Sequence, residues 1–472
     1  MAKTFWVETL GCPKNQVDSD KLTGTMLADG LVPAEGADEA DLVVVNTCAF
    51  IEEARQESID TVLALSDARA DGARVVVTGC MAERYGDELA EALPEIDAVA
   101  GFGMALTPSP TAVAVAIGTK PGSSKLGSSR SGGAASGGAT SGEVPAFDLL
   151  NLPRPRSTAP WAYVKVAEGC DRACGFCAIP SFRGKQRSRS QVDLLDEVDQ
   201  LHAREIVLVA QDLAAYGRDQ GVGQRSIVPL VRAVAERVDR VRLLYLYPSD
   251  LTAELIDTIL ATGVPYFDLS LQHVSAPLVR RMRRWGNGDK FLERIATIRA
   301  AEPGAAFRSN FIVGYPGETE DDHDELLAFV REAQLDWCGF FAFSPEQGTY
   351  AADLDQQVPV ALMHERLAEL RELQDAITAT RRDELIGSRV EVLVDAPGVG
   401  RTYREAPEID GIVTVPAHLE VGTFVELDVV GALGPDLIAE LIADPIADLV
   451  PGSTSGLDHG SAPGPVTIGS SS

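Results

Sequence analysis

The run Trp161-Ala-Tyr-Val-Lys-Val-Ala-Glu-Gly-Cys170-Asp-Arg-Ala-Cys174-Gly-Phe-Cys177 decides the fold of the middle of the chain. Its first part, Trp161–Val166, has the apolar composition of a buried strand, and three cysteines follow at the spacing C-x3-C-x2-C. Such a loop can wrap three thiolates around one 4Fe-4S cube and leave one iron open to chelate a substrate or cofactor. A zinc knuckle, the alternative, normally needs a fourth Cys or His nearby, and none follows.

Outward from this run, further apolar strand candidates alternate with amphipathic helices. They are Glu205–Ala210, Arg242–Leu246, Tyr266–Leu271, Ala306–Val313 and Trp337–Phe343. Together with Trp161–Val166 they predict a partial (β/α)6 barrel of the TIM type, closed by a long helix from Val358 to about Ile386. Barrels of this kind keep their chemistry in the loops at the carboxyl ends of the strands, which is where the three cysteines lie.

The first part of the chain has the rhythm of a parallel, Rossmann- or flavodoxin-like α/β domain. Its strand candidates Thr4–Glu8, Leu42–Asn46 and Arg74–Gly79 are each followed by a cysteine, at Cys12, Cys48 and Cys80. Since the carboxyl ends of parallel strands share one sheet edge, we expect these thiols to converge on a second 4Fe-4S cluster. The alternative is three independent core cysteines, and Cys338 in the last barrel strand is more simply a small buried hydrophobe.

The remaining segments complete a multidomain α/β organisation. Arg389–Asp395, Gly411–Val415 and Thr423–Val430 alternate with Gly and Pro turns, which predicts a small antiparallel, OB-like β-barrel. The composition collapses to Gly, Ser and Ala within 120–142, and the tail after Pro451 is rich in Gly, Ser and Pro. We therefore predict domains at 1–117, 156–385 and 386–446, a flexible linker at 118–155 and a disordered tail at 447–472.

Composition limits the classes of partner and compartment. The 472 residues include 70 acidic and 41 basic side chains, for a net charge of −29, so a basic partner is favoured and naked nucleic acid disfavoured. No signal sequence or membrane-length apolar run is present, which predicts a cytoplasmic protein without a membrane partner. Seven cysteines, an odd number, favour metal or redox use over a disulfide framework.

Several motifs resemble the radical-SAM methylthiotransferase family. The general matches are Leu10-Gly-Cys-Pro-Lys-Asn-Gln-Val-Asp-Ser19, Val45-Asn-Thr-Cys48, Thr78-Gly-Cys80 and the Cys170 loop. The branch that modifies a ribosomal protein is matched by Cys12-Pro-Lys-Asn15, Ala178-Ile-Pro-Ser-Phe-Arg-Gly-Lys-Gln-Arg-Ser188, Phe311-Ile-Val-Gly-Tyr-Pro-Gly-Glu-Thr-Glu320, Ser344-Pro-Glu-Gln-Gly-Thr349 and Arg404-Glu-Ala-Pro-Glu-Ile-Asp-Gly411. The resemblance extends from about Lys3 to Ile442 and implies a methylthiotransferase domain, a radical-SAM barrel and a TRAM domain.

This resemblance also implies an activity. The enzyme would be a transferase with two 4Fe-4S clusters and S-adenosyl-L-methionine that adds a methylthio group to the β-carbon of an aspartate in small-subunit ribosomal protein S-twelve. No catalytic side chains are implied beyond the cluster ligands, because a 5′-deoxyadenosyl radical attacks the unactivated C–H bond. The partners implied are that ribosomal protein, an electron donor such as flavodoxin or ferredoxin, and a sulfur donor, with the chain itself a monomer.

Residues after the barrel strands are candidates for the S-adenosylmethionine pocket. These residues are Gln211, Asp212, Tyr247, Gln272, His273 and Gly314. His273 could equally be a structural histidine, and Gly314 could serve a tight turn. Lys14 and Asn15 beside Cys12 could bind substrate or cap a helix, and the basic run Arg183, Lys185, Arg187 and Arg189 could bind phosphate or pair with neighbouring carboxylates.

Two other functions remain open. A tRNA-modifying relative would need a basic last domain, but Arg389, Arg401 and Arg404 face eleven carboxylates there: Glu391, Asp395, Glu405, Glu408, Asp410, Glu420, Glu426, Asp428, Asp436, Glu440 and Asp444. That balance would repel phosphates and attract a basic protein. The second alternative is a non-enzymatic iron–sulfur redox protein, a function that would not explain the six-strand barrel.

Overall fold

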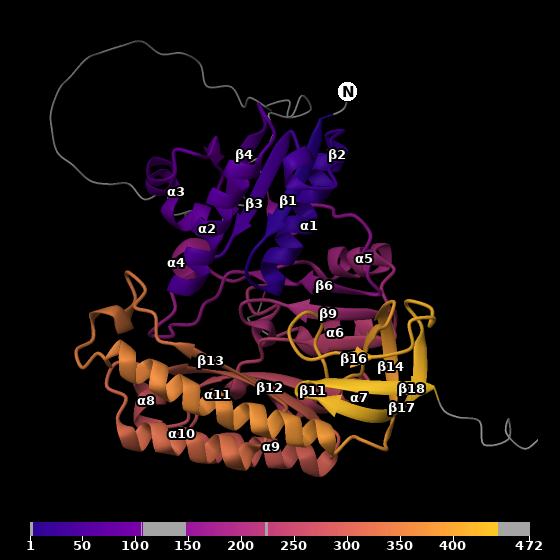
Figure 1. Cartoon of the computed structure of the whole chain (residues 1–472). Coiled ribbons are helices and arrows are strands. Elements are labelled where there is room, and N and C mark those ends of the chain that lie inside the picture. Colours follow the sequence, from indigo (N-terminus) through magenta and orange to yellow (C-terminus); the bar gives the residue numbers. More distant parts are fainter. Residues whose placement is uncertain (1–2, 105, 107–147, 222–224, 442–472) are drawn as a thin grey trace, which may run out of the picture.

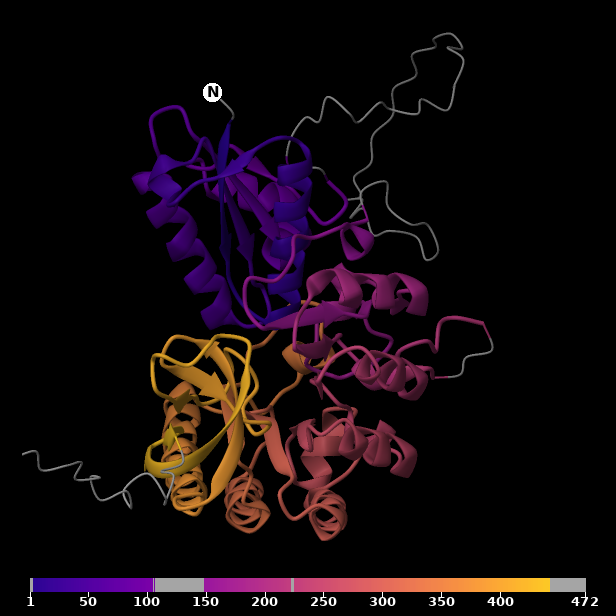
Figure 2. The same cartoon turned by 90° about the vertical axis from the view of Figure 1, so that its right-hand side faces the viewer.

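The computed structural model describes residues 3–104, 106, 148–221 and 225–441. An N-terminal α/β domain lies at one end of the molecule, a half-open barrel lies beneath it, and a small closed β-barrel packs at the side (Figure 1 and Figure 2). The tail at 447–472 and most of the linker at 118–155 lie outside the described residues. Within the described residues, no helix combines the length and apolar character needed to cross a membrane.

The N-terminal sheet is parallel, with the strand order β2-β1-β3-β4-β5. Its elements are β1 (Thr4–Thr9), α1 (Pro13–Ala28), β2 (Val32–Pro33), η1 (Ala37–Glu39), β3 (Leu42–Thr47), α2 (Glu52–Ala68), β4 (Arg74–Gly79), α3 (Cys80–Ala92) and β5 (Ala98–Val99). The three predicted strands form the centre, and the buried valines of β3 and β4 make up its core. The edge strands β2 and β5 have two residues each and leave no alternation to recognise in the sequence.

The central barrel contains six parallel strands in two sheets, ordered β10-β9-β6 and β11-β12-β13. They are β6 (Trp161–Lys165), β9 (Glu205–Val209), β10 (Arg240–Leu243), β11 (Tyr266–Gln272), β12 (Ala306–Val313) and β13 (Trp337–Ala342). The predicted strand Arg242–Leu246 begins two residues earlier and ends at Leu243, because Tyr245 has a left-handed backbone with φ 64°. Beyond Tyr245, a single bridge from Leu246 to Leu269 joins the two sheets.

Helices cover the outside of the barrel. They are α5 (Gln191–Leu201), α6 (Ile227–Ala235), α7 (Ala253–Ala261), α8 (Ala276–Arg281), α9 (Gly288–Ala301), α10 (Glu320–Ala333) and α11 (Val360–Asp383). The short helix α4 (Ile179–Arg183) instead packs against α3 of the N-terminal domain. The 3-10 turns are η2 (Leu149–Asn151), η3 (Leu213–Ala215), η4 (Pro248–Asp250) and η5 (Tyr350–Asp353). The apolar faces of the covering helices and the outer faces of the strands share one large hydrophobic core. The antiparallel pair β7 (Ala167–Glu168) and β8 (Arg187–Ser188) closes the base of the cysteine loop.

The last domain is a closed barrel with the strand order β14-β15-β16-β18-β17. Its strands are β14 (Arg389–Ala396), β15 (Val399–Arg401), β16 (Val413–Thr414), β17 (Phe424–Leu433) and β18 (Asp436–Leu441). All pairs are antiparallel except β16 with β18, and apolar side chains such as Val392 and Leu427 fill the interior. Buried charges join this domain to the half-open barrel, since Glu205 accepts from Arg242 at 2.7 Å and from Arg401 at 3.1 Å.

The N-terminal domain is held at both edges of the half-open barrel. On one side α1 packs along β6, and Asp18 of α1 accepts from Lys165 in a fully buried ion pair. On the other side the loop after β13 carries Glu346, whose carboxylate accepts from Arg55 at 2.7 Å and from Arg84 at 2.5 Å. This domain therefore spans the opening between β6 and β13.

Candidate functional site

Cys12, Cys48 and Cys80, here called the N-terminal trio, come together at the carboxyl edge of the N-terminal sheet. Gly11 precedes Cys12 with φ 98°, and a Cβ on it would lie 3.0 Å from the Cys48 sulfur. Gly79 precedes Cys80 with φ 92°, and a Cβ on it would lie 2.3 Å from the Asn46 side chain. A Cβ atom would not fit at either position. Both glycines are therefore required for the close approach of the loops that carry Cys12, Cys48 and Cys80.

Helix ends favour negative charge at the N-terminal trio. Cys12 occupies the N-cap position of α1 and Cys80 is the first residue of α3. The positive ends of two helix dipoles therefore point at the place where thiolates and a cluster would carry negative charge. This location at the edge of a parallel sheet is the one that the strand-to-cysteine spacing predicts.

The thiols of the N-terminal trio are close enough to influence one another electrostatically. Burial, together with the charges of Cys12 and Cys80, raises the pKa of the Cys48 thiol to about 12, and burial also raises the pKa of Cys80. Burial acts to raise the pKa of Cys12 too, but the nearby charges of Lys14 and Arg183 bring it below its ordinary value. Cys12 is thus the thiol of this trio that deprotonates most readily.

Cys170, Cys174 and Cys177, here called the loop trio, follow β6 and β7 at the mouth of the barrel. The loop is fixed to the surrounding barrel, because the Gly175 amide donates to the Met282 carbonyl at 2.9 Å and the Gly175 carbonyl accepts from Ala351 at 2.8 Å. The Arg284 guanidinium donates to the Cys174 sulfur at 3.1 Å. Burial raises the pKa of Cys170 to about 11 and that of Cys177 to about 12.

Both trios have the donor set of a 4Fe-4S site. Each offers three thiols and one guanidinium donating to a sulfur, which suits a cluster of net negative charge. Within the described part of the chain, no three His, Cys, Asp or Glu side chains converge closely enough to grip a single ion. Three thiols without a fourth protein ligand are the donor set that a 4Fe-4S cube with one open iron takes, so the chemistry of both trios fits that group.

A buried polar network extends from Glu168, in the segment that leads into the Cys170 loop, to the N-terminal trio. Glu168, two residues before Cys170, accepts from Lys165 at 2.7 Å and from Arg183 at 2.9 Å. Burial opposes its ionisation, yet Arg183 and Lys165 hold the pKa of Glu168 far below its usual range. The same Arg183 guanidinium also donates a hydrogen bond to the Cys80 sulfur of the N-terminal trio, at 3.0 Å. One set of buried charges therefore ties the N-terminal trio to the segment that leads into the Cys170 loop.

Three of the predicted S-adenosylmethionine contacts lie beside the loop trio. Gln211 donates to Glu168 at 2.7 Å, Asp212 accepts from Arg172 at 2.6 Å, and the Tyr247 ring lies 3.8 Å from the Arg172 guanidinium and 4.3 Å from that of Arg284. Among the described residues, Gln211 Oε1, Asp212 Oδ1 and Arg284 Nε are buried without a hydrogen-bond partner. Unpaired buried polar atoms are costly, so they suit a polar ligand that would satisfy them.

The other three predicted contacts lie at the carboxyl ends of β11 and β12. Gln272, at the end of β11, has a left-handed backbone with φ 76°. His273 is fully buried, and its Nδ1 accepts from the Ser275 amide at 3.1 Å. Gly314 packs against α11, since a Cβ on it would lie 2.1 Å from the Met363 side chain. The structure therefore brings Gln211, Asp212 and Tyr247 together around the loop trio. His273 has a buried Nε2 without a hydrogen-bond partner, 3.8 Å from Glu318, and Gly314 packs against α11.

The burial of His273 predicts a pH dependence of stability. Burial lowers the pKa of His273 to about 4, while Asp322 opposes and His323 and Arg366 add to this shift. Because the unfolded chain protonates this residue near 6.5, stability is unaffected above that pH and falls by roughly 3 kcal/mol as the pH drops from 6.5 to 4. Urea unfolding at several pH values should show a shallower fall in His273→Gln, whereas the exposed His364→Gln keeps the wild-type slope.

Several residues of the site were not predicted from the sequence. Tyr245 has the left-handed backbone described above, and its ring lies 3.3 Å from the Lys14 ammonium, next to Cys12. Non-glycine residues in this conformation are strained and concentrate at functional sites. Arg172 lies within the cysteine loop and forms ion pairs with Asp212 and Asp250. The only feature of the sequence that could have marked Arg172 as a site residue is its position between Cys170 and Cys174.

The residues next to the cysteine motifs have partners of their own. Asn15 is buried, donates to the Leu10 carbonyl at 2.8 Å and accepts from Arg183 at 2.9 Å, so it ties the N-terminal trio together rather than capping α1. In the basic run, Arg187 pairs with Asp148 and Arg189 with Glu197. Most of that run is thus neutralised by carboxylates.

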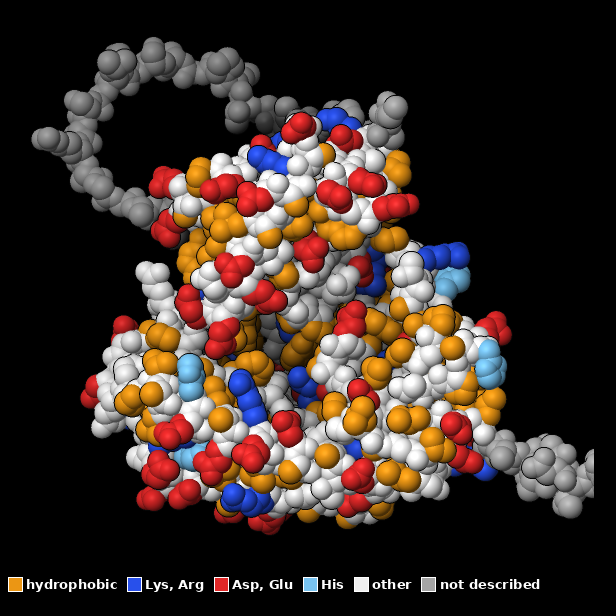
Figure 3. Space-filling model, viewed as in Figure 1, with side chains coloured by type: hydrophobic (Ala, Val, Ile, Leu, Met, Phe, Trp, Pro, Cys, Tyr) orange, Lys and Arg blue, Asp and Glu red, His pale blue; other side chains and the backbone are white. Residues whose placement is uncertain are grey.

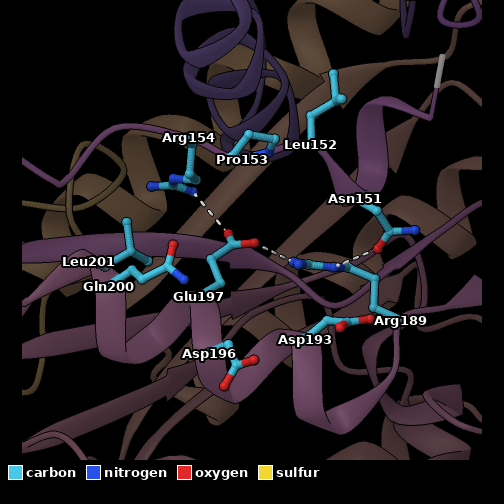
Figure 4. Close-up of a pocket in the computed structure, with 10 residues that line it drawn as sticks. All are labelled: Asn151, Leu152, Pro153, Arg154, Arg189, Asp193, Asp196, Glu197, Gln200 and Leu201. Carbon is cyan, nitrogen blue, oxygen red and sulfur yellow. Dashed lines mark hydrogen bonds and ion pairs between the residues drawn. The ribbon is translucent and has the colours of Figure 1, made fainter. Parts of the chain in front are cut away.

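A cavity of about 250 Å³ lies away from both trios, between α5 and the segment after η2. Glu197 is at its centre, with Arg154 and Arg189 pointing at the carboxylate from opposite sides (Figure 4). Lys21 of α1 donates to Glu197 at 3.2 Å and to the Leu150 carbonyl at 2.8 Å. These contacts fasten the returning chain between the N-terminal domain and the barrel, so the cavity belongs to the domain junction.

Comparison with known proteins agrees with this architecture. Residues 4–101 match the Uncharacterized protein family UPF0004, 164–330 the Radical SAM superfamily, and 386–442 the TRAM domain. The protein named Ribosomal protein uS12 methylthiotransferase RimO from Streptomyces coelicolor is 40% identical over 93% of this chain and 97% of its own length. The chain belongs to the RimO family. Another member, from Moorella thermoacetica, is 42% identical over 87% of this chain and 92% of its own length.

A comparison of folds with solved structures also finds similar chains, at much lower sequence identity. The radical S-adenosylmethionine methyltransferase TsrM from Kitasatospora setae is 14% identical, with a TM-score of 0.42 over 84% of this chain and 80% of that one. The RimO family thus confirms the resemblance to radical-SAM methylthiotransferases and the three-part organisation of N-terminal domain, radical-SAM domain and TRAM domain.

Proposed function

We propose that this RimO-family chain transfers a methylthio group to the β-carbon of an aspartate in ribosomal protein uS12, in the cytoplasm. The observation that carries the proposal is the pair of cysteine trios, each with one sulfur that accepts a hydrogen bond from a guanidinium. When bound, a 4Fe-4S cluster at the loop trio supplies radical chemistry from S-adenosylmethionine, and one at the N-terminal trio supplies a site for sulfur.

The chain's own side chains would hold and orient these groups. Cys170, Cys174 and Cys177 would bind one cluster, and Cys12, Cys48 and Cys80 the other. Gln211, Asp212 and Tyr247 are the best placed to contact S-adenosylmethionine, because they surround the loop trio and two of them carry unpaired buried oxygens. Arg172 and Arg284, on either side of Tyr247, would offer cationic donors to a carboxylate.

The charge of the TRAM barrel supports a basic protein as the substrate. All three of its described arginines already face carboxylates: Arg401 pairs with Asp395 at 2.6 Å, Arg404 lies 3.6 Å from Asp336, and Arg389 lies 3.4 Å from Asp428. These pairs leave little basic charge in the described barrel for phosphates, so tRNA is disfavoured as the substrate. In the view of Figure 3, acidic side chains are scattered over the outer surface of the molecule, and basic side chains lie both on that surface and at the hollow between the N-terminal domain and the barrel.

Further partners are part of the proposal. Reductive cleavage of S-adenosylmethionine requires an electron donor, for which flavodoxin or ferredoxin would serve, and the transferred sulfur requires a donor that renews it. With its single chain supplying both trios, the protein would act as a monomer.

The test is mass spectrometry of uS12 after anaerobic incubation with reconstituted protein, dithionite and S-adenosylmethionine. The mass of one methylthio group should appear on an aspartate, and 5′-deoxyadenosine should form. Unmodified tRNA, added in place of uS12, serves as the control substrate. Modification of the tRNA but not of uS12 would overturn the substrate, and the absence of 5′-deoxyadenosine in all reactions would overturn the chemistry.

A further inference from the structure

The guanidinium of Arg183 lies at the N-terminal trio, although the residue itself ends the short helix that follows the Cys170 loop. Its Nη2 donates to the Cys80 sulfur at 3.0 Å and to Asn15 Oδ1 at 2.9 Å, and its Nη1 donates to both carboxylate oxygens of Glu168 at 2.9 and 3.0 Å. Asp18 lies 3.3 Å from the same guanidinium. The side chain is buried, at 3% of its full exposure, so these contacts act with little screening by water.

The position of Arg183 follows from the fold. It ends α4, a single-turn helix that begins two residues after Cys177 and packs against α3, the helix that starts at Cys80. Figure 1 shows α4 lying next to α3 and apart from the other barrel helices. The helix α4, which follows the Cys170 loop, therefore places the Arg183 guanidinium at the N-terminal trio.

We propose that Arg183 sets the reduction potential of a cluster bound by Cys12, Cys48 and Cys80, through its hydrogen bond and charge at the Cys80 sulfur. This inference rests on the proposed function, which places a cluster there. Reduction adds one negative charge to a cluster, and a cationic donor on a ligating sulfur stabilises that charge. Arg183 thus keeps this cluster easier to reduce than its buried surroundings would otherwise allow.

The loop trio contains a matched arginine. Arg284 donates to the Cys174 sulfur at 3.1 Å and to the Ser270 carbonyl, and it stacks on the Tyr247 ring. Each trio therefore has one sulfur that accepts from one guanidinium, and the two arginines reach different trios. Arg183 and Arg284 should act on different clusters, which allows each variant to control for the other.

The experiment is a redox titration of the reconstituted full-length protein, followed by electron paramagnetic resonance. Wild-type protein should show two reduction transitions, of which only one responds to S-adenosylmethionine. In Arg183→Met the transition that does not respond should move to lower potential, with its reduced-to-oxidised ratio at fixed potential falling about tenfold, or about 59 mV for one electron. Arg183→Lys, which keeps the charge but loses the fork, should move the same transition less, and Arg284→Lys should move the other one.

Each outcome decides something different. Wild-type protein with one cluster per chain would overturn the proposed function. Two clusters with unmoved transitions in both Arg183 variants would overturn the role of Arg183 alone. An equal shift of both transitions in Arg183→Lys would overturn the local role of Arg183 at the Cys80 sulfur, because a loss of domain packing would affect both clusters alike.

Discussion

Replacing Cys174 by Ala should reduce 5′-deoxyadenosine formation by at least about a thousandfold, because the Cys170 loop has no fourth cysteine to replace the lost ligand. Replacing Cys48 by Ala should leave 5′-deoxyadenosine formation close to the wild type and abolish methylthio transfer to uS12. Product analysis of both variants, with iron content of each, measures the two effects. If Cys48→Ala still transferred the methylthio group, the N-terminal trio would not be a cluster site.

Cys338 provides the matched control for these substitutions. It lies in β13, where burial raises the pKa of its thiol, and it belongs to neither trio. Cys338→Ala should keep full iron content and both activities, with a stability loss of about 1 kcal/mol for the sulfur removed from the core. Loss of iron in this variant would mean that the assignment of six cysteines to two clusters is wrong.

Replacing Glu205 by Ala should destabilise the protein by about 3 to 5 kcal/mol, the largest structural effect that we expect. The carboxylate is fully buried between Arg242 and Arg401, so its removal leaves two guanidinium groups buried without their shared partner. Urea or thermal unfolding measures the loss. The exposed pair Arg232 and Glu254 is the control, and Glu254→Ala should change stability by less than about 0.5 kcal/mol.

The buried Glu205 carboxylate should also make the stability of the protein depend on pH in the acid range. Burial opposes its ionisation, but Arg242 and Arg401 lower the pKa of Glu205 to about 2. Its contribution to stability is complete above the ordinary value of 4.5 and is lost as the pH falls from there toward 2. Wild-type protein should therefore lose stability over that range more steeply than Glu205→Gln does.

Strands and helices with a clear apolar or helical pattern in their own residues could be predicted from the sequence. The buried strands β3 and β4 and the long helix α11 carry uninterrupted apolar or helical patterns, and the family signature follows from short motifs around the cysteines. The convergence of Cys12, Cys48 and Cys80 was also predictable, because parallel strands that end in cysteines meet at one sheet edge. The early end of β10 was not, since the left-handed Tyr245 lies in an ordinary apolar run.

Contacts between distant parts of the chain could not be predicted in this way. Arg183 and Cys80 are 103 positions apart and meet only because α4 packs on α3. The Glu346 contacts with Arg55 and Arg84 span still longer separations and depend on how two domains dock. Strands β15 and β18 were missed because each depends on its neighbours in a closed barrel rather than on a strong pattern of its own.

The short helix α4 has a consequence for how this protein can be recombined with its relatives. The N-terminal domain ends before the chain reaches α4, yet its Cys80 takes a hydrogen bond from Arg183 in that helix. A chimera joined between the N-terminal domain and the barrel would inherit the three thiols from one parent and their cation from the other. Functional hybrids should therefore require that both parents match at this helix.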